Sequence, residues 1–136
     1  MRRKIIHAIT KAPAPEAVYA RTAAADDLLG VRFSPLEICW SRFLKREYMP
    51  YEDVVWTYLS IVETQMQTGE FDGACLADVR LVLFTADGRY ASVKFDRQSY
   101  GEYALQLVQK AAPHIAIGCT PENREKFPFP LPTWTK

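Results

Sequence analysis

The stretch that decides the fold is "VRLVLFTADGRYASVKF", residues 79–95. Apolar and polar side chains alternate along both of its halves, so each half presents one apolar face when it is extended. Asp87-Gly88 lies between the halves, and this dipeptide favours the positive φ angles of a tight hairpin turn. The stretch therefore predicts two antiparallel strands joined at Asp87-Gly88.

An amphipathic helix is predicted directly after the hairpin, from Ser99 to Ala112. Ser99 and Glu102 have the spacing of a capping box, and Pro113 ends the helix. Its apolar residues recur at helical spacing and form one stripe: Tyr100, Tyr103, Ala104, Leu107, Val108 and Ala111. We expect this stripe to cover the strands, so that Leu107→Asp unfolds or aggregates the protein.

Strands are also predicted upstream of the hairpin. Residues 30–43, "GVRFSPLEICWSRF", are rich in β-branched and aromatic side chains, with a turn signal at Ser34-Pro35. Alternation after this turn places three apolar side chains on one face: Leu36, Ile38 and Trp40.

The run "VVWTYLSIV", residues 54–62, fits both the helical and the extended period. Its β-branched and aromatic side chains keep more χ1 freedom on a pleated surface than in a helix, which favours a strand. Because apolar side chains would then lie on both faces, we expect a central strand. A loop with Gly69 and Gly73 is predicted over residues 67–74.

The N-terminal segment, residues 1–29, is expected to be partly helical. Residues 16–29 are rich in Ala, Pro15 stands where a helix could begin, and Gly30 stands where it would end, although a strand stays open for this region. The basic start resembles a signal peptide, but its apolar stretch is too short and contains His7 and Lys11.

Composition and charge narrow the functional classes. A chain of 136 residues with 49% apolar and 24% charged residues predicts one globular domain, 1–136. Seventeen basic residues against sixteen acidic ones give no electrostatic reason to expect nucleic-acid binding. No run approaches the roughly 20 apolar residues of a transmembrane helix. Three dispersed cysteines predict neither disulfides nor a zinc site and favour the cytoplasm: Cys39, Cys75 and Cys119.

No motif predicts catalysis, a cofactor or a metal. His114 and Cys119 could form a nucleophile pair, but a helix-end position and burial explain them more simply. No phosphate-binding glycine motif is present. The acid pairs Asp26-Asp27 and Glu52-Asp53 are adjacent in sequence, so their side chains need not converge for catalysis, and turn or cap positions explain them better. Asp72 lies in a glycine-rich loop without the regularly spaced oxygen ligands of a calcium site.

The order of segments resembles a known family. "EICWSRF" (37–43), "YMPYEDVVWTYL" (48–59) and "DVRLVLFTADGRYASVKF" (78–95), followed by a helix and "PHIAIGCTPENREKF" (113–127), resemble small bacterial domains of pleckstrin-homology-like (PH-like) fold and unknown function. In that family a P-Y-x-D-[VI] turn leads into a central strand, and a D-G hairpin follows. The resemblance covers residues 28–127.

This resemblance implies an α+β fold in which an antiparallel strand roll or partly open barrel is capped by a C-terminal amphipathic helix. The roll and helix would occupy residues 30–127, before an extended tail at 128–136. It implies a non-catalytic binding or assembly module, and we first expect protein–protein interaction or self-association. A small enzyme with a dispersed site stays as an alternative.

A second alternative is an anion or phospholipid head-group binder. Lipid-binding members of this fold use a basic cluster in a loop between the first strands. The counterpart implied here is "SRFLKREYM", residues 41–49, in which Glu47 dilutes the positive charge. Its basic residues are Arg42, Lys45 and Arg46.

The tail "KFPFPLPTWTK", residues 126–136, alternates prolines with large apolar side chains, a composition that favours an extended strip. Its apolar side chains are Phe127, Phe129, Leu131 and Trp134. The strip could fold back on its own domain, dock on a second copy of the chain, or engage another protein. Three upstream aromatic residues are expected in the core rather than in a ligand groove: Trp40, Trp56 and Tyr58.

Overall fold

The computed structural model describes residues 3–42, 44–65 and 75–135. In chain order its elements are β1 (Ile5–His7), α1 (Glu16–Ala24), β2 (Asp26–Leu28), β3 (Val31–Phe33), β4 (Glu37–Arg42), β5 (Lys45–Pro50), the 3-10 turn η1 (Tyr51–Asp53), β6 (Val54–Gln65), β7 (Cys75–Thr85), β8 (Tyr90–Phe95), α2 (Gln98–Ala111), β9 (Ala116–Ile117) and α3 (Pro121–Lys126). The loop predicted at 67–74, with Asp72, lies outside the described residues, and so does the Cys75 side chain.

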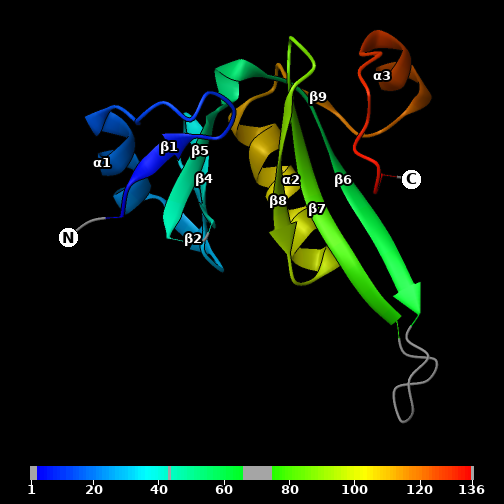
Figure 1. Ribbon diagram of the computed structural model, residues 1–136, viewed down its shortest axis with the longest axis horizontal. Helices are drawn as coiled ribbons and strands as arrows, with labels where there is room; N and C mark the ends of the chain where they lie inside the picture. The colour runs from blue at the N-terminus through cyan, green and yellow to red at the C-terminus, as the bar shows by residue number, and fades with distance from the viewer. Residues whose placement is uncertain (1–2, 43, 66–74, 136) are drawn as a thin grey trace.

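The chain has a mixed α+β fold with two sheets, which confirms the predicted class. The first sheet has the order β1-β5-β4-β3-β2, and the second has the order β8-β7-β6-β9. Two short strands, β1 and β9, pair in parallel with their neighbours, whereas the other pairs are antiparallel. Figure 1 shows the first sheet with α1 in one half of the molecule and the second sheet with α2 and α3 in the other. The described strands do not close into a barrel.

The hairpin predicted at 79–95 is confirmed as β7 and β8, with Phe84 opposite Tyr90. The turn differs in detail, because only Gly88 has a positive φ, of 85°. The Thr85 amide donates to the Arg89 carbonyl at 2.9 Å, so three residues form the loop. The strand at 54–62 is also confirmed: β6 lies between β7 and β9 and carries apolar side chains on both faces.

The main core contains residues of both sheets and of α2. The helix lies so close to the strands that a Cβ on Gly101 would be 2.7 Å from Leu59 Cδ1. The predicted stripe was partly wrong, because Tyr103 is half exposed and Ala111 is exposed. The fully buried helix positions are Gly101, Ala104 and Val108.

The start of α2 also differs from the prediction. The helix begins at Gln98 after Arg97, and no side chain caps it, so the capping box of Ser99 and Glu102 does not form. Instead, the Gln98 side-chain amide donates to Glu102 Oε1 at 2.8 Å. Leu107 is only partly buried and lies outside the main core. Val108→Asp, rather than Leu107→Asp, is therefore expected to unfold the protein.

The N-terminal helix is shorter than predicted. It ends at Ala24, and Gly30 instead completes the β2–β3 hairpin, where Leu29 and Gly30 have φ angles of 51° and 91°. Pairing with β3 and packing of Leu28 on the core override the helical composition of this segment. The turn at Ser34-Pro35 is confirmed by the Ser34 amide, which donates to the Glu37 carbonyl at 2.9 Å.

The alternation predicted Leu36 on the buried face of β4, and this prediction is wrong. It lies in the turn before the strand begins and is 56% exposed. Ile38 and Trp40 are buried as expected. On the opposite face of β4, Glu37 and Cys39 are buried beneath α1, whose Val18 packs in the same cluster as Cys39.

Candidate functional site

The predicted basic cluster lies on the hairpin formed by β4 and β5. Arg42 is directly opposite Lys45 in this hairpin, so their side chains lie on the same face. Arg46 is opposite Ser41, and the alternation of a strand sends its side chain to the other face. The structure thus brings Arg42 and Lys45 together and separates Arg46 from them.

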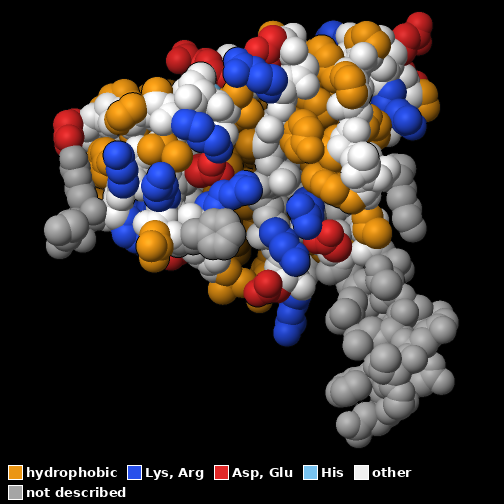
Figure 2. All heavy atoms as spheres, in the orientation of Figure 1, with side chains coloured by type: hydrophobic (Ala, Val, Ile, Leu, Met, Phe, Trp, Pro, Cys, Tyr) orange, Lys and Arg blue, Asp and Glu red, His pale blue; other side chains and the backbone are white. Residues whose placement is uncertain are grey.

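Arg42 and Lys45 border a hollow of about 550 Å³, which we call the basic hollow. Figure 2 shows Lys and Arg side chains gathered on this half of the molecule. The basic hollow also contains Lys4 and Lys11, which no sequence pattern predicted as site residues. Its lining residues are Lys4, Ile6, Lys11, Pro13, Arg42, Leu44, Lys45 and Glu47.

Parallel pairing of β1 with β5 brings the N-terminal residues to this hollow. Ile6 lies opposite Glu47 in this pairing. Continuing the same register two residues toward the N-terminus of each strand places Lys4 beside Lys45. Lys11 comes from the loop between β1 and α1. No local pattern could place residues 4–11 next to the hairpin, because the contact depends on a long-range parallel pairing.

Positive charge dominates the basic hollow. Glu47 is buried on its floor, where Lys11 Nζ lies 2.5 Å from Oε2 and Arg42 Nη1 lies 3.8 Å from Oε1. Within the part of the chain that the structure describes, Lys4 and Lys45 form no ion pair. Four cations around one carboxylate leave a local excess of three positive charges, which is suited to an anionic ligand.

An apolar side chain projects beside these cations. Leu44 lies at the tip of the β4–β5 hairpin and is 90% exposed. It lines the basic hollow together with Lys45 and Arg42. An exposed apolar tip flanked by cations is the arrangement that suits a membrane–water interface.

His7 anchors the loop that carries Lys11. Its Nδ1 accepts hydrogen bonds from the amides of Ile9 and Thr10, at 3.1 and 3.2 Å, so in the neutral ring the proton is on Nε2. Nε2 lies 3.0 Å from Asp53 Oδ2 and donates to it. Both ring nitrogens are therefore used within the protein, and His7 holds the loop against η1.

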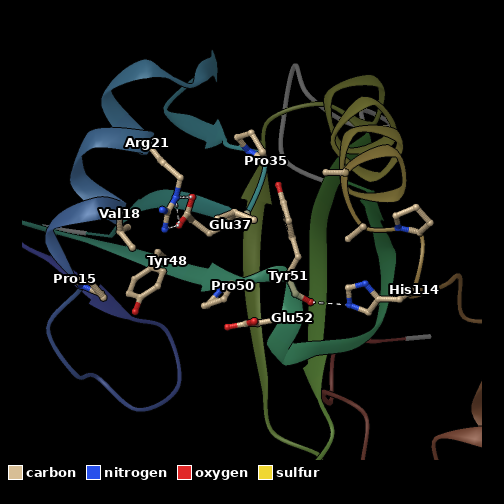
Figure 3. A pocket seen from close by; sticks show the side chains of 14 residues that line it. Pro15, Val18, Arg21, Pro35, Glu37, Tyr48, Pro50, Tyr51, Glu52 and His114 are labelled. Carbon is tan, nitrogen blue, oxygen red and sulfur yellow. Dashed lines mark hydrogen bonds and ion pairs between the residues drawn. The ribbon is translucent and has the colours of Figure 1, made fainter.

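A second hollow, of about 390 Å³, lies between α1 and the end of α2, and we call it the α1–α2 cleft. Its walls come from α1, the β3–β4 turn, the end of β5, η1 and the residues after α2, as Figure 3 shows. Prolines and aromatic rings form much of its lining, including Pro15, Pro35, Pro50, Pro113, Tyr48 and Tyr51.

A buried ion pair forms one wall of the α1–α2 cleft. Glu37 is 2% exposed and accepts from Arg21 Nε and Nη2 at 2.6 to 3.0 Å. The hydrogen bond from Arg21 to Glu37 raises the pKa of the guanidinium further. The Ser34 hydroxyl also donates to Glu37. The carboxylate is therefore satisfied by its neighbours.

Tyr51 is buried in the main core and also lines this cleft. Its hydroxyl is buried and has no hydrogen-bond partner among the described residues, and burial raises its pKa well above the usual range, with a smaller effect of Glu37. The Tyr51 carbonyl accepts from His114 Nε2 at 3.0 Å. His114 and Cys119 are not brought together, because Cys119 belongs to a different cluster, beneath the tail.

The predicted interaction tail folds back on its own domain, which is the first of the three alternatives. Phe127, Phe129, Leu131 and Trp134 pack against the face of the second sheet that carries Trp56, Tyr58, Val82 and Phe84, which we call the aromatic face. Phe127 stacks on Trp56, and Phe129 stacks on Phe84, with ring centroids 5.7 and 5.5 Å apart. Trp56 and Tyr58 are buried, as predicted.

Polar contacts also hold the tail. The Tyr58 hydroxyl lies 3.1 Å from the Thr135 hydroxyl, and the Arg80 guanidinium lies 4.8 Å from the centre of the Trp134 ring. The apolar side chains of the tail are thus partly buried within the chain itself.

One residue of each acid pair singled out in the sequence has a local partner. Asp27 accepts from the Gly30 amide at 2.7 Å in the β2–β3 turn, and Asp53 accepts from His7. Within residues 3–42, 44–65 and 75–135, no three His, Cys, Asp or Glu side chains are placed to hold a metal ion. Over the same residues, no helix combines the length and apolar composition required to cross a bilayer.

Comparison of the chain with protein-family models, with curated proteins and with solved structures finds no match.

Proposed function

We propose that this chain is a non-catalytic binding module of the PH-like type, and that it holds the anionic head group of a membrane lipid in the basic hollow. One observation carries the proposal: four cations from three separate chain segments surround a single hollow. Phosphate and carboxylate groups form strong charge-assisted hydrogen bonds with such a set of donors.

The order of elements supports the PH-like part of the proposal. Four successive antiparallel strands, β2 to β5, precede three more, β6 to β8, and α2 then packs on the second group. This is the order that the resemblance implies: a strand roll followed by a capping helix. The η1 turn at Tyr51–Asp53 leads directly into β6, as in the P-Y-x-D-[VI] pattern.

Leu44 favours a membrane surface over a soluble acidic partner. When Lys45 and Arg42 approach lipid phosphates, the exposed Leu44 side chain reaches the apolar side of the interface, where its burial is favourable. A reducing compartment such as the cytoplasm fits the free cysteines, Cys39 and Cys119, and its membrane surfaces carry anionic lipids.

Protein–protein interaction through the tail receives less support. Its apolar side chains pack on the aromatic face of the same chain, so a partner would first have to displace them. The cations of the basic hollow, by contrast, are exposed, and Lys4 and Lys45 have no ion pair within the described ranges.

Vesicle co-sedimentation tests the proposal. Vesicles of phosphatidylcholine alone are compared with vesicles in which about a fifth of the lipid is phosphatidylserine. The intact chain is expected to bind the anionic vesicles, to release them at high salt, and not to bind the neutral ones. Equal binding to both kinds of vesicle, or binding to neither, would contradict the proposal.

Substitutions then locate the surface. Lys4→Ala and Lys45→Ala are each expected to weaken vesicle binding about five-fold, since one basic residue contributes about 1 kcal/mol at an anionic surface. Arg46→Ala is the matched control, because Arg46 lies on the same hairpin but on its opposite face. If Arg46→Ala weakens binding as much as Lys45→Ala does, the basic hollow is not the site.

A further inference from the structure

We propose that Glu47 determines which head group the basic hollow accepts: one that carries a single phosphodiester charge, rather than a polyphosphorylated one. The inference rests on the proposed function, because it concerns the ligand of the same hollow. It assigns a role to Glu47, which supplies the carboxylate in the described lining of the hollow.

Three cations of the hollow form a row across neighbouring strands. Arg42 of β4 lies opposite Lys45 of β5. The Arg46 amide donates to the Lys4 carbonyl at 2.9 Å, which keeps β1 paired with β5 as far as Lys4. Paired strands lie about 4.8 Å apart, so the side chains of Lys4 and Lys45 can both reach the oxygens of one phosphate group. This row therefore suits a single phosphate bound between two lysines.

Glu47 holds the other two cations of the hollow. Its side chain is 6% exposed, and Oε2 lies 2.5 Å from Lys11 Nζ. Lys11 Nζ also donates to the Ala8 carbonyl at 2.8 Å, so two acceptors of the protein itself hold this ammonium group. Arg42 Nη1 lies 3.8 Å from Oε1, which leaves Arg42 to share its charge between Glu47 and a ligand.

The backbone fixes Lys11 beside Glu47. Lys11 has a φ of 62°, in the left-handed region that residues other than glycine rarely adopt. Its amide donates to the His7 carbonyl at 3.0 Å, and an antiparallel bridge between Ile6 and Pro13 closes the loop. A strained conformation persists only where its surroundings enforce it. Lys11 is therefore held toward Glu47 rather than toward a ligand.

Additional phosphates on a ligand would meet a like charge in the hollow. Because Glu47 is buried on the floor, salt and water screen its charge less than they would at an exposed position. Each added phosphate brings further negative charge toward this carboxylate, while Lys11 is already engaged by it. A single phosphodiester between Lys4 and Lys45 avoids this repulsion.

Two kinds of vesicle test the inference on the intact chain. One contains phosphatidylglycerol, whose phosphodiester carries one charge. The other contains phosphatidylinositol bisphosphate, at a mole fraction that gives the vesicles the same electrophoretic mobility. The chain is expected to bind the bisphosphate vesicles no more tightly than the phosphatidylglycerol vesicles. Tighter binding to the bisphosphate overturns this inference alone, whereas binding to neither overturns the proposed function as well.

Glu47→Gln removes the carboxylate and keeps the size of the side chain. The Lys11 and Arg42 side chains are 56% and 61% exposed, so they stay hydrated and the variant is expected to fold. The affinity for bisphosphate vesicles relative to phosphatidylglycerol vesicles should rise about five-fold, the effect of one additional basic residue. An unchanged ratio of the two affinities overturns the role of Glu47.

Glu102→Gln is the matched control for this variant. It removes the same charge from α2, which contributes nothing to the described lining of the basic hollow. The ratio of the two affinities should therefore stay as in the wild type. A rise equal to that of Glu47→Gln would show that net charge, and not the position of Glu47, sets the preference.

A second substitution shows whether the released lysine causes the change. In the Glu47→Gln background, Lys11 is free to contact a second phosphate, so adding Lys11→Gln should abolish the five-fold rise. If the double variant keeps that rise, Glu47 does not act by holding Lys11, and the inference is wrong.

Discussion

Phe129 of the C-terminal tail lies directly over Gly88 of the β7–β8 turn, so closely that a Cβ on Gly88 would be 3.1 Å from Phe129 Cδ1. The same glycine has a φ of 85°, which L side chains rarely adopt. Gly88 therefore serves two purposes: it allows the tight hairpin, and it leaves room for the tail to pack on the aromatic face.

Gly88→Ala is expected to destabilise the protein through both effects. The positive φ costs roughly 1–2 kcal/mol for a residue with a Cβ, and the contact with Phe129 adds about 1 kcal/mol. Gly30→Ala is the matched control, because Gly30 has a similar φ of 91° and a Cβ added there would have no atom within 4 Å. Urea denaturation should show the larger loss for Gly88→Ala.

The contact contribution can be isolated in a double-mutant cycle. In a Phe129→Ala background, Gly88→Ala should cost no more than Gly30→Ala does, because the ring that meets the new methyl group is gone. If the excess cost of Gly88→Ala persists without the Phe129 ring, the two residues do not interact as described.

Removal of residues 128–136 is expected to destabilise the chain and to expose the aromatic face. Partial burial of Phe129, Leu131 and Trp134 should contribute at least about 3 kcal/mol. The truncated chain should bind an apolar dye and self-associate, since Trp56 and Phe84 would lose their cover. Sedimentation and dye fluorescence measure both effects, and an unchanged unfolding curve would show that the tail does not pack there.

The Arg21–Glu37 pair should matter more than an exposed ion pair. Glu37→Gln is expected to lower the free energy of unfolding by about 2 kcal/mol, because Arg21 loses the buried carboxylate that balances its charge. The loss stays below that of a fully buried pair because the Arg21 side chain is one-third exposed to water. Asp27→Asn is the control, since Asp27 is exposed and its Oδ2 lies 3.8 Å from Arg32 Nη2. Its cost should stay below about 1 kcal/mol. Equal losses in thermal or urea unfolding would contradict this assignment.

The stability that the β7–β8 turn contributes should decrease at acidic pH. The hydrogen bond from the Thr85 hydroxyl, with smaller contributions from Arg89, holds the pKa of Asp87 below its ordinary value. A lowered folded-state pKa stabilises the protein above the unfolded pKa, and this stabilisation is lost as the pH falls through the folded pKa, below about pH 4.

Thr85→Val should therefore raise the pKa of Asp87 toward its ordinary value, which an NMR titration of the carboxyl carbon measures directly. Asp87→Asn should remove this part of the acid dependence of stability altogether. An Asp87 pKa that does not change in Thr85→Val would show that the hydroxyl is not the main cause.

Local signals predicted the β-rich part of the fold well. The hairpin at Asp87-Gly88 and the strand at 54–62 were correct because alternation and side-chain branching act within one strand. The prediction was less accurate at Asp26–Leu28, where pairing with β3 overrides a helical composition. It was also less accurate at Tyr103, which is half exposed because the strands cover a different part of the helix than the apolar pattern suggested.

The candidate sites were harder to predict. Arg42 and Lys45 were identified from the hairpin sequence, but Lys4 and Lys11 reach the same hollow only because β1 pairs in parallel with β5. The α1–α2 cleft has no sequence signal, since its lining comes from segments as far apart as Pro15 and His114.

The amino-acid sequence by itself determined that residues 54–62 and the two halves of 79–95 are strands, where the β7–β8 hairpin turns and that an extended apolar tail follows, because these depend on the intrinsic preferences of neighbouring residues. Only the tertiary structure decided that the tail covers Trp56 and Phe84, that Arg46 is separated from Lys45, and that Tyr51 is buried without a partner among the described residues. These outcomes depend on contacts between segments that are distant in the sequence, and the local preferences of the residues carry no information about the energies of those contacts.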